Sequence, residues 1–284
     1  MVDVYFTLST GRCGTKFLSR LCRDNLEDTV CRHEPYFDRG NPPMFGLSIY
    51  DFSIGRHDRI QNDVRAKRDW IERCGAKVYI ETSHAFLKSF YQASLDFWPD
   101  IRFIHVIRNP MSTARSEANR QIAAERWHLP FRNYWAEDGK SRFAWSLSGL
   151  EEIFRSYDLS KLSLFQRYVV EWVEIQNRAM WVIEAAKAHD RCFTLHSPVD
   201  LNKPERIQAL FDHFGMKTRK AQVIFPTNYS KRLSQNRNLR YKTQVSDQDA
   251  KEFKDVIDKM PTRYLEIFRR EPYASFPWVE MVQR

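Results

Sequence analysis

The first 25 residues constrain the fold more than any other segment. Residues 2–8 (VDVYFTL) are mostly apolar and rich in β-favouring side chains, which predicts a buried strand. Apolar residues at helical spacing predict a helix over residues 15–23. The turn between them, STGRCG, contains Gly11 and Gly14. A strand, a glycine turn and a helix in this order are typical of the first unit of an α/β protein.

The rest of the chain repeats the alternation of strands and helices. Strands are predicted at residues 77–81, 102–107 and 191–195. Helical patterns cover residues 165–189 and 204–216, and the second begins with a proline and ends near a glycine. The prediction is one α/β domain spanning residues 1–284, with a central parallel sheet flanked by helices.

Residues 117–160 interrupt this rhythm. They mix tryptophans and other aromatic residues with arginines. Long excursions of this kind often cover an active site, which predicts a helical, substrate-covering segment. An ordinary helical excursion packed on the sheet explains the composition equally well.

Composition favours a globular protein outside the membrane. Hydrophobic residues make up 43% of the chain, but no apolar run approaches the ~18 residues of a membrane span. The N-terminus lacks the features of a secretory signal. The chain has five cysteines, an odd number, with no C-x-x-C pair and no spacing typical of metal ligands. This pattern predicts free thiols in a reducing cytoplasm. They are Cys13, Cys22, Cys31, Cys74 and Cys192.

A net charge of +9 favours an anionic partner without identifying it. Nucleic acid, a membrane surface or a small polyphosphate ligand would all be attracted. Nucleic-acid binding predicts a basic stripe with interleaved aromatic residues. Here the basic residues form no long block, and several follow predicted strands, which favours a small ligand over nucleic acid or membrane.

The STGRCG turn has the chemistry of an anion site. Glycines at positions 11 and 14 allow close backbone approach and positive φ. Amides at the start of the following helix favour negative charge, and Arg12, Thr15 and Lys16 add donors. A Walker loop requires G-x-x-x-x-G-K-[ST], which this turn lacks. A P-loop kinase or other phosphotransferase is therefore the weaker alternative.

A second polar cluster follows the predicted strand 102–107. In VIRNPMSTARS, Arg108 ends the strand, Pro110 suits the first position of a helix, and Ser116 lies about two turns on. Ligands in parallel sheets bind beyond the carboxyl ends of strands. We therefore expect the stretches 9–15, 82–84 and 108–116 to meet around one ligand.

The two motifs together resemble the sulfotransferases that use 3′-phosphoadenosine-5′-phosphosulfate (PAPS). That family carries a 5′-phosphosulfate loop after its first strand, to which STGRCGTKFL is similar. It also carries an R-x-P-x-x-x-x-x-S element for the 3′-phosphate, which Arg108, Pro110 and Ser116 match at full spacing. The stretch 196–216 resembles a later family segment, so the resemblance covers roughly residues 2–240.

The resemblance implies a P-loop-like sulfotransferase fold, PAPS as co-substrate, no metal, and a small-molecule or carbohydrate acceptor. Arg12 and Lys16 would stabilise the leaving group, with Arg12 acting only electrostatically. Cys13 replaces the usual serine of the loop, so we expect it to contribute its amide alone. The implied co-substrate residues are Arg12, Cys13, Gly14, Thr15, Lys16, Phe17, Arg108 and Ser116.

Two residues are candidates for the general base that deprotonates the acceptor. His84, in YIETSHAF, resembles the base of cytosolic sulfotransferases, whereas Glu34, in CRHEPYF, resembles that of tyrosyl members. The arginine loop favours Glu34, and both remain open. His33 and Glu81 are candidates for supporting roles. The adenine contact stays unassigned between His196 and Ser197, and a non-catalytic nucleotide-binding module that lacks a base is a further alternative.

Overall fold

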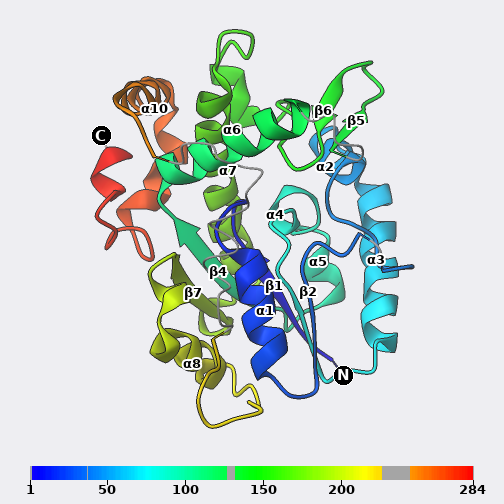
Figure 1. Cartoon of the computed structure of the whole chain (residues 1–284). Coiled ribbons are helices and arrows are strands. Elements are labelled where there is room, and N and C mark those ends of the chain that lie inside the picture. The colour runs from blue at the N-terminus through cyan, green and yellow to red at the C-terminus, as the bar shows by residue number, and fades with distance from the viewer. Residues whose placement is uncertain (1, 37, 127–131, 226–243, 284) are drawn as a thin grey trace.

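The computed structural model describes residues 2–36, 38–126, 132–225 and 244–283, and its centre is a five-stranded parallel sheet (Figure 1). The strand order is β2-β3-β1-β4-β7, which confirms the predicted α/β class. The strands are β1 (Asp3–Leu8), β2 (Thr29–Arg32), β3 (Val78–Glu81), β4 (Arg102–Arg108) and β7 (Cys192–Ser197).

Strand β2 is the one member of this sheet that the sequence did not predict. Its four residues, TVCR, include only two apolar side chains, too few for a periodic signal. It pairs in parallel with β3, from Thr29 opposite Val78 to Arg32 opposite Glu81. This pairing matters for the site, because Glu34 lies two residues after the end of β2.

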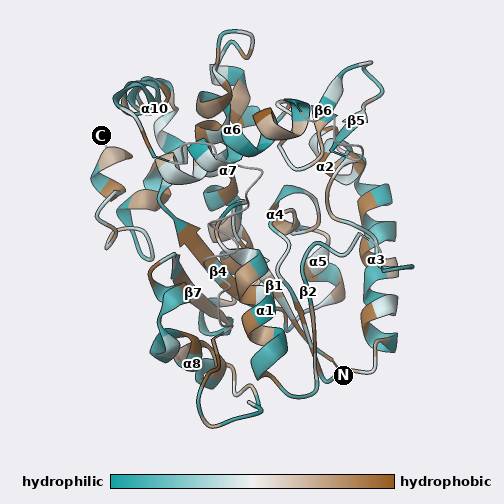
Figure 2. Ribbon diagram, viewed as in Figure 1, coloured by the Kyte–Doolittle hydropathy of each residue, from teal (hydrophilic) through white to brown (hydrophobic). Residues whose placement is uncertain are grey.

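The sheet separates two apolar cores. Along β1, Tyr5 faces one core, while Val4, Phe6 and Leu8 face the other, as the period of a strand requires. Helices α1 (Thr15–Asn25) and α8 (Pro204–His213) cover the smaller core. The larger core involves α2 (Leu47–Ser53), α3 (His57–Arg73), α4 (Phe86–Ser89), α6 (Pro110–Arg126), α7 (Leu164–Ala185) and α10 (Asp247–Lys259). Figure 2 shows β4 and β7 as largely hydrophobic and the outer helix α10 as largely hydrophilic.

Helix starts follow their local sequence signals. Pro204 is the first residue of α8, as predicted. Pro110 likewise begins α6, and Asn109 Oδ1 accepts a hydrogen bond of 3.0 Å from the Ser112 amide in the manner of a helix cap. A capping box involving Ser163 and Gln166 starts α7. Short helices complete the chain: α5 (Ser94–Phe97) and the 3-10 turns Glu152–Ser156, His189–Arg191, Asp200–Asn202, Thr262–Tyr264, Glu266–Arg269 and Val279–Met281.

The segment 117–160 is only partly helical where the structure describes it. Residues 117–126 complete α6, and a 3-10 turn lies near the far end at Glu152–Ser156. Between these two helical parts, β5 (Asn133–Trp135) and β6 (Ser141–Phe143) form an antiparallel hairpin. Residues 127–131 lie outside the described residues, and with them the tryptophan and histidine at the start of this excursion. Across the described ranges, no helix is long and apolar enough to cross a membrane.

Candidate active site

The loop between β1 and α1 lies at the carboxyl edge of the sheet. Arg12 has φ 63° and Gly14 has φ 87°, both in the left-handed region. Helix α1 begins at Thr15, with Gly14 as its N-cap and no side-chain cap. Backbone turns of this kind gather amides around an anion, and the positive end of the helix dipole adds to the attraction. The two positive φ angles and the helix start are compatible with the predicted anion site.

The two glycines of the loop serve different purposes, which corrects the expectation that both relax the backbone. Only Gly14 has a positive φ. At Gly11 an added Cβ would overlap Glu117 Oε1 and would lie 3.2 Å from His84 Cε1. A larger residue at position 11 would therefore have to displace the Glu117 carboxylate, which packs against the loop backbone together with His84.

The two predicted anion motifs lie in contact. Arg108, at the end of β4, donates a hydrogen bond of 2.6 Å from Nη1 to the carbonyl oxygen of Arg12, 96 residues away. Arg12 Nε donates a hydrogen bond of 3.1 Å to Oγ of Ser116, a buried residue of α6. The arginines are held near each other by a carbonyl and a hydroxyl, and such positive groups together favour an anionic ligand.

The remaining loop residues occupy distinct environments. Cys13 is buried, with Sγ 3.1 Å from Thr10 Oγ1, and burial raises the pKa of its thiol. Thr15 is also buried, whereas Lys16 is exposed on the first turn of α1. Phe17 packs on Phe225, with ring centroids 6.0 Å apart. The Cys13 side chain is thus enclosed within the loop, and Phe17 packs against the smaller core.

Glu34 and His84, the two candidate bases, are hydrogen-bond neighbours. His84 Nε2 lies 3.0 Å from Glu34 Oε1, and the side chains are 2% and 18% exposed respectively. Burial alone would raise the pKa of Glu34, but the charge of His84 and its hydrogen bond hold that pKa below its usual value. The two residues that the sequence offered as alternative bases therefore form one pair, and Glu34 is the more solvent-accessible of the two.

A buried arginine and a tryptophan complete this pair. Arg120 Nη1 lies 3.5 Å from His84 Nε2, and Arg120 Nη2 lies 2.6 Å from Glu117 Oε2. Trp145 Nε1 donates to Glu34 Oε2 at 3.1 Å. The Arg120 guanidinium also lies over the Trp145 ring, 5.7 Å from its centroid. The pair is therefore fixed from two sides.

Arg120, Glu117 and Trp145 are neighbours of the pair that the sequence did not predict. A signal for Glu117 and Arg120 was present, because both follow Ser116 within one helical turn of α6. No comparable signal existed for Trp145. It comes from the 117–160 excursion, whose position over the sheet is a tertiary feature.

Four further candidates were predicted to support the base or to contact adenine: His33, Glu81, His196 and Ser197. His33 Nδ1 lies 3.1 Å from Thr82 Oγ1, beside the pair. Glu81 instead binds Lys67 and Tyr79 in the core, so a supporting role next to the base is wrong for it. Ser197 lies by the loop, with Oγ 3.6 Å from a Cβ placed on Gly14. His196 packs on the ring of Phe276, at 3.7 Å between centroids.

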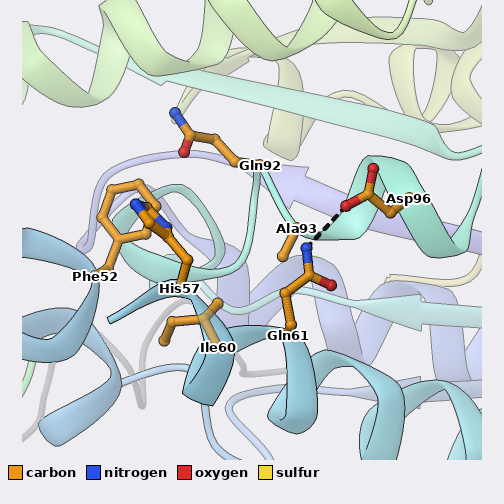
Figure 3. A pocket seen from close by; sticks show the side chains of 7 residues that line it. All are labelled: Phe52, His57, Ile60, Gln61, Gln92, Ala93 and Asp96. Carbon is orange, nitrogen blue, oxygen red and sulfur yellow. Dashed lines mark hydrogen bonds between the residues drawn. The ribbon is translucent and has the colours of Figure 1, made fainter. Parts of the chain in front are cut away.

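A different cavity lies between α3 and the α4–α5 segment, lined by His57, Gln61 and Asp96 among others (Figure 3). Its volume is about 170 Å³, and Gln61 Nε2 donates to Asp96 Oδ2 at 2.8 Å. It contains none of the predicted site residues. In the part of the chain that the structure describes, no three His, Cys, Asp or Glu side chains gather as a metal site.

Comparisons with known proteins give matches in structure alone. No protein-family model matches the chain, and no curated protein matches its sequence. A sulfotransferase from Alicyclobacillus acidocaldarius matches with a TM-score of 0.49 and 18% identity, over 96% of this chain and 98% of the other. The sulfotransferase domain from the curacin biosynthetic pathway matches with a TM-score of 0.44 and 8% identity, over 92% and 99%. Both neighbours are sulfotransferase structures, and at these identities the likeness concerns the fold alone.

Proposed function

We propose that this protein transfers the sulfuryl group of PAPS to a hydroxyl or amine of a small-molecule or carbohydrate acceptor, releasing 3′-phosphoadenosine-5′-phosphate (PAP). The observation that carries the proposal is the contact between the two motifs. Arg108 and Ser116 both bind Arg12, so the loop and the strand end can hold one nucleotide between them. The Glu34–His84 pair lies at the neighbouring strand ends of the same edge.

On the donor side, the loop amides and Thr15 would hold the 5′-phosphate. Arg108 and Ser116 would hold the 3′-phosphate, and Ser116 can exchange its present bond to Arg12 for one to the ligand. Arg12 and Lys16 would stabilise charge that develops as the S–O bond to the phosphate breaks. One such preorganised donor typically contributes ~3–4 kcal/mol to catalysis.

On the acceptor side, we assign Glu34 as the general base. As the acceptor oxygen forms its bond to sulfur, its proton passes to the Glu34 carboxylate. Glu34 suits this role better than His84, because its side chain is 18% exposed and that of His84 only 2%. His84 then orients the carboxylate, and Arg120 supplies positive charge behind both.

Isothermal calorimetry with PAP and with ATP–magnesium tests the proposal. We expect PAP to bind in the absence of magnesium and more tightly than ATP–magnesium. The alternative, a P-loop kinase, predicts the reverse preference, and that result would overturn the sulfotransferase assignment. A catalytically silent module predicts PAP binding with no turnover on any acceptor.

Arg108→Ala tests the placement of the 3′-phosphate. We expect this variant to weaken binding of PAP far more than binding of 5′-AMP, since only PAP carries that phosphate. Arg155→Ala, which removes an exposed arginine of the 3-10 turn Glu152–Ser156, serves as the charge control. Equal losses for the two nucleotides would show that the 3′-phosphate binds elsewhere.

Domain organisation and location belong to the same proposal. A single domain would span residues 1–284, with the 117–160 segment covering the acceptor. A cytoplasmic enzyme suits the five cysteines, all of which are free thiols. Nucleic acid and membranes are not expected partners.

A further inference from the structure

Arg132 lies beside the candidate base without an acidic partner. Its guanidinium carbon is 5.0 Å from the centroid of the Trp145 ring, the ring whose Nε1 binds Glu34. The residue is half-buried. Burial and the charge of Arg120 lower the pKa of Arg132. A cation in this setting is stabilised when an anion joins it.

Other arginines around the β5–β6 hairpin are already neutralised. Arg142 forms a two-pronged bond with Asp138, and Arg56 forms one with Glu137. Arg120 pairs with Glu117. Among the residues that the structure describes, no Asp or Glu lies within salt-bridge distance of Arg132. Within the described ranges Arg132 therefore forms no ion pair at contact distance, and the Glu34 charge only partly offsets the burial and the Arg120 charge that lower its pKa.

The platform under Arg132 is rigid. Lys88 Nζ donates to the Trp145 carbonyl, and Glu171 Oε2 accepts a hydrogen bond of 2.9 Å from the Leu147 amide. Lys88 and Glu171 themselves form a buried ion pair at 2.5 Å. These contacts hold the backbone at Trp145 and two residues after it, beneath the ring on which Arg132 lies.

Aromatic rings extend this platform. Phe45 stacks on Trp145 with centroids 5.0 Å apart, and Tyr36 stacks on Phe45 at 5.7 Å. Tyr36 is 45% exposed and lies two residues after Glu34. The acceptor side of the site thus combines an aromatic wall, a carboxylate base and a guanidinium one indole ring away.

We infer that the acceptor carries a carboxylate close to the hydroxyl that is sulfated, and that Arg132 binds this carboxylate. The inference rests on the proposed function and narrows its acceptor class to compact hydroxy acids. A planar guanidinium suits a carboxylate because two parallel N–H···O bonds can form, and such charge-assisted bonds are stronger than neutral ones. Loss of that contact typically weakens binding by roughly 10- to 100-fold.

The test compares hydroxy acids with their neutral amides on the PAP-saturated protein. The probes are 4-hydroxybenzoate, 3-hydroxybutyrate and glucuronate, each with its amide, measured by calorimetry. Saturating PAP occupies the Arg12 and Arg108 region, so the acids can report only on the acceptor side. We expect at least one acid to bind roughly 10-fold or more tightly than its amide, and Arg132→Gln to remove that preference.

Two further variants keep the test decisive. Arg155→Gln removes an equal charge from an exposed turn and should leave the acid preference intact. Arg132→Lys retains the charge but not the paired donors, and should retain part of the preference. An acid preference that survives in Arg132→Gln, or no acid in the panel that binds better than its amide, overturns the inference. Failure of PAP to bind at all would instead count against the proposed function.

Discussion

Two clusters of buried charge show how differently this fold uses ions. The core cluster consists of Lys67, Glu81, Tyr79 and Asn41. Lys67 and Glu81 are both fully buried, with Nζ 2.9 Å from Oε2, and Tyr79 and Asn41 bind the same two ions. The edge cluster consists of Glu34, His84, Glu117 and Arg120, at the carboxyl ends of the strands.

The clusters differ in how completely their polar atoms are matched. In the core cluster only Glu81 Oε1 is left without a hydrogen bond. In the edge cluster both Glu117 oxygens and His84 Nδ1 lack one, since Arg120 is close to Glu117 but poorly aligned with it. A cluster whose polar atoms are nearly all bonded contributes mainly to stability, whereas a cluster with several unbonded polar atoms has capacity to bind a ligand.

The variant Glu34→Gln is expected to show the largest difference between the two clusters, because it acts on turnover. Loss of a general base typically costs 10²- to 10⁴-fold in rate, so we expect a fall of about that size in turnover at saturating PAPS. The amide keeps the shape of the side chain but loses the attraction to His84 that lowers the pKa of Glu34, so the free energy of unfolding should fall while the loss of turnover is much larger. His84→Ala should slow the reaction less, since His84 orients the base. If neither variant slows turnover, the edge cluster is not the base.

Lys67→Met tests the core cluster. It leaves Glu81 as an uncompensated buried charge, which typically costs about 3–5 kcal/mol of unfolding free energy. Urea denaturation measures the loss, and turnover of the folded fraction should stay near that of the wild type. The double variant Lys67→Met/Glu81→Gln should recover part of the stability. A single variant as stable as the parent would contradict the structural role.

A third buried polar group, His105, hydrogen-bonds Gln176 and should make the stability of the core depend on pH. Burial lowers the pKa of His105 from 6.5 to about 4. Between those values the unfolded chain takes up a proton that the folded chain does not, so stability falls as the pH drops from 6.5 to 4. The contribution reaches about 3 kcal/mol at most. Urea midpoints across this range should show a weaker pH dependence in His105→Gln than in the parent.

Trp145→Phe gives the smallest expected effect. It removes one hydrogen bond to Glu34 while it keeps an aromatic ring beneath Arg132. A single hydrogen bond to a charged group contributes about 1.5–3 kcal/mol and neutral ones less, so turnover should fall by roughly 10-fold. PAP affinity, measured by calorimetry, should not change. A parallel loss of PAP affinity would mean that Trp145 supports the loop rather than the base.

Sequence patterns determined the local parts of this molecule. The apolar period predicted β1, β3, β4 and β7, and helix-end signals placed Pro110 and Pro204 at the starts of their helices. The loop 9–15 and the Arg108–Ser116 element were also recognisable, because each depends on residues close together in the chain. Such features rest on backbone geometry and spacing within one or two elements.

The assembly of the site depends on contacts between elements far apart in the chain. The four-residue strand β2 gave no periodic signal, yet its place beside β3 brings Glu34 to His84. The contact of Glu117 with Gly11 and the approach of Trp145 to Glu34 depend on how α6 and the hairpin segment pack over the sheet. Periodicity shows which face of an element is apolar, but strand order and the packing of distant elements follow from the whole set of contacts. That is why the sequence offered two bases as alternatives and the fold joined them in one pair.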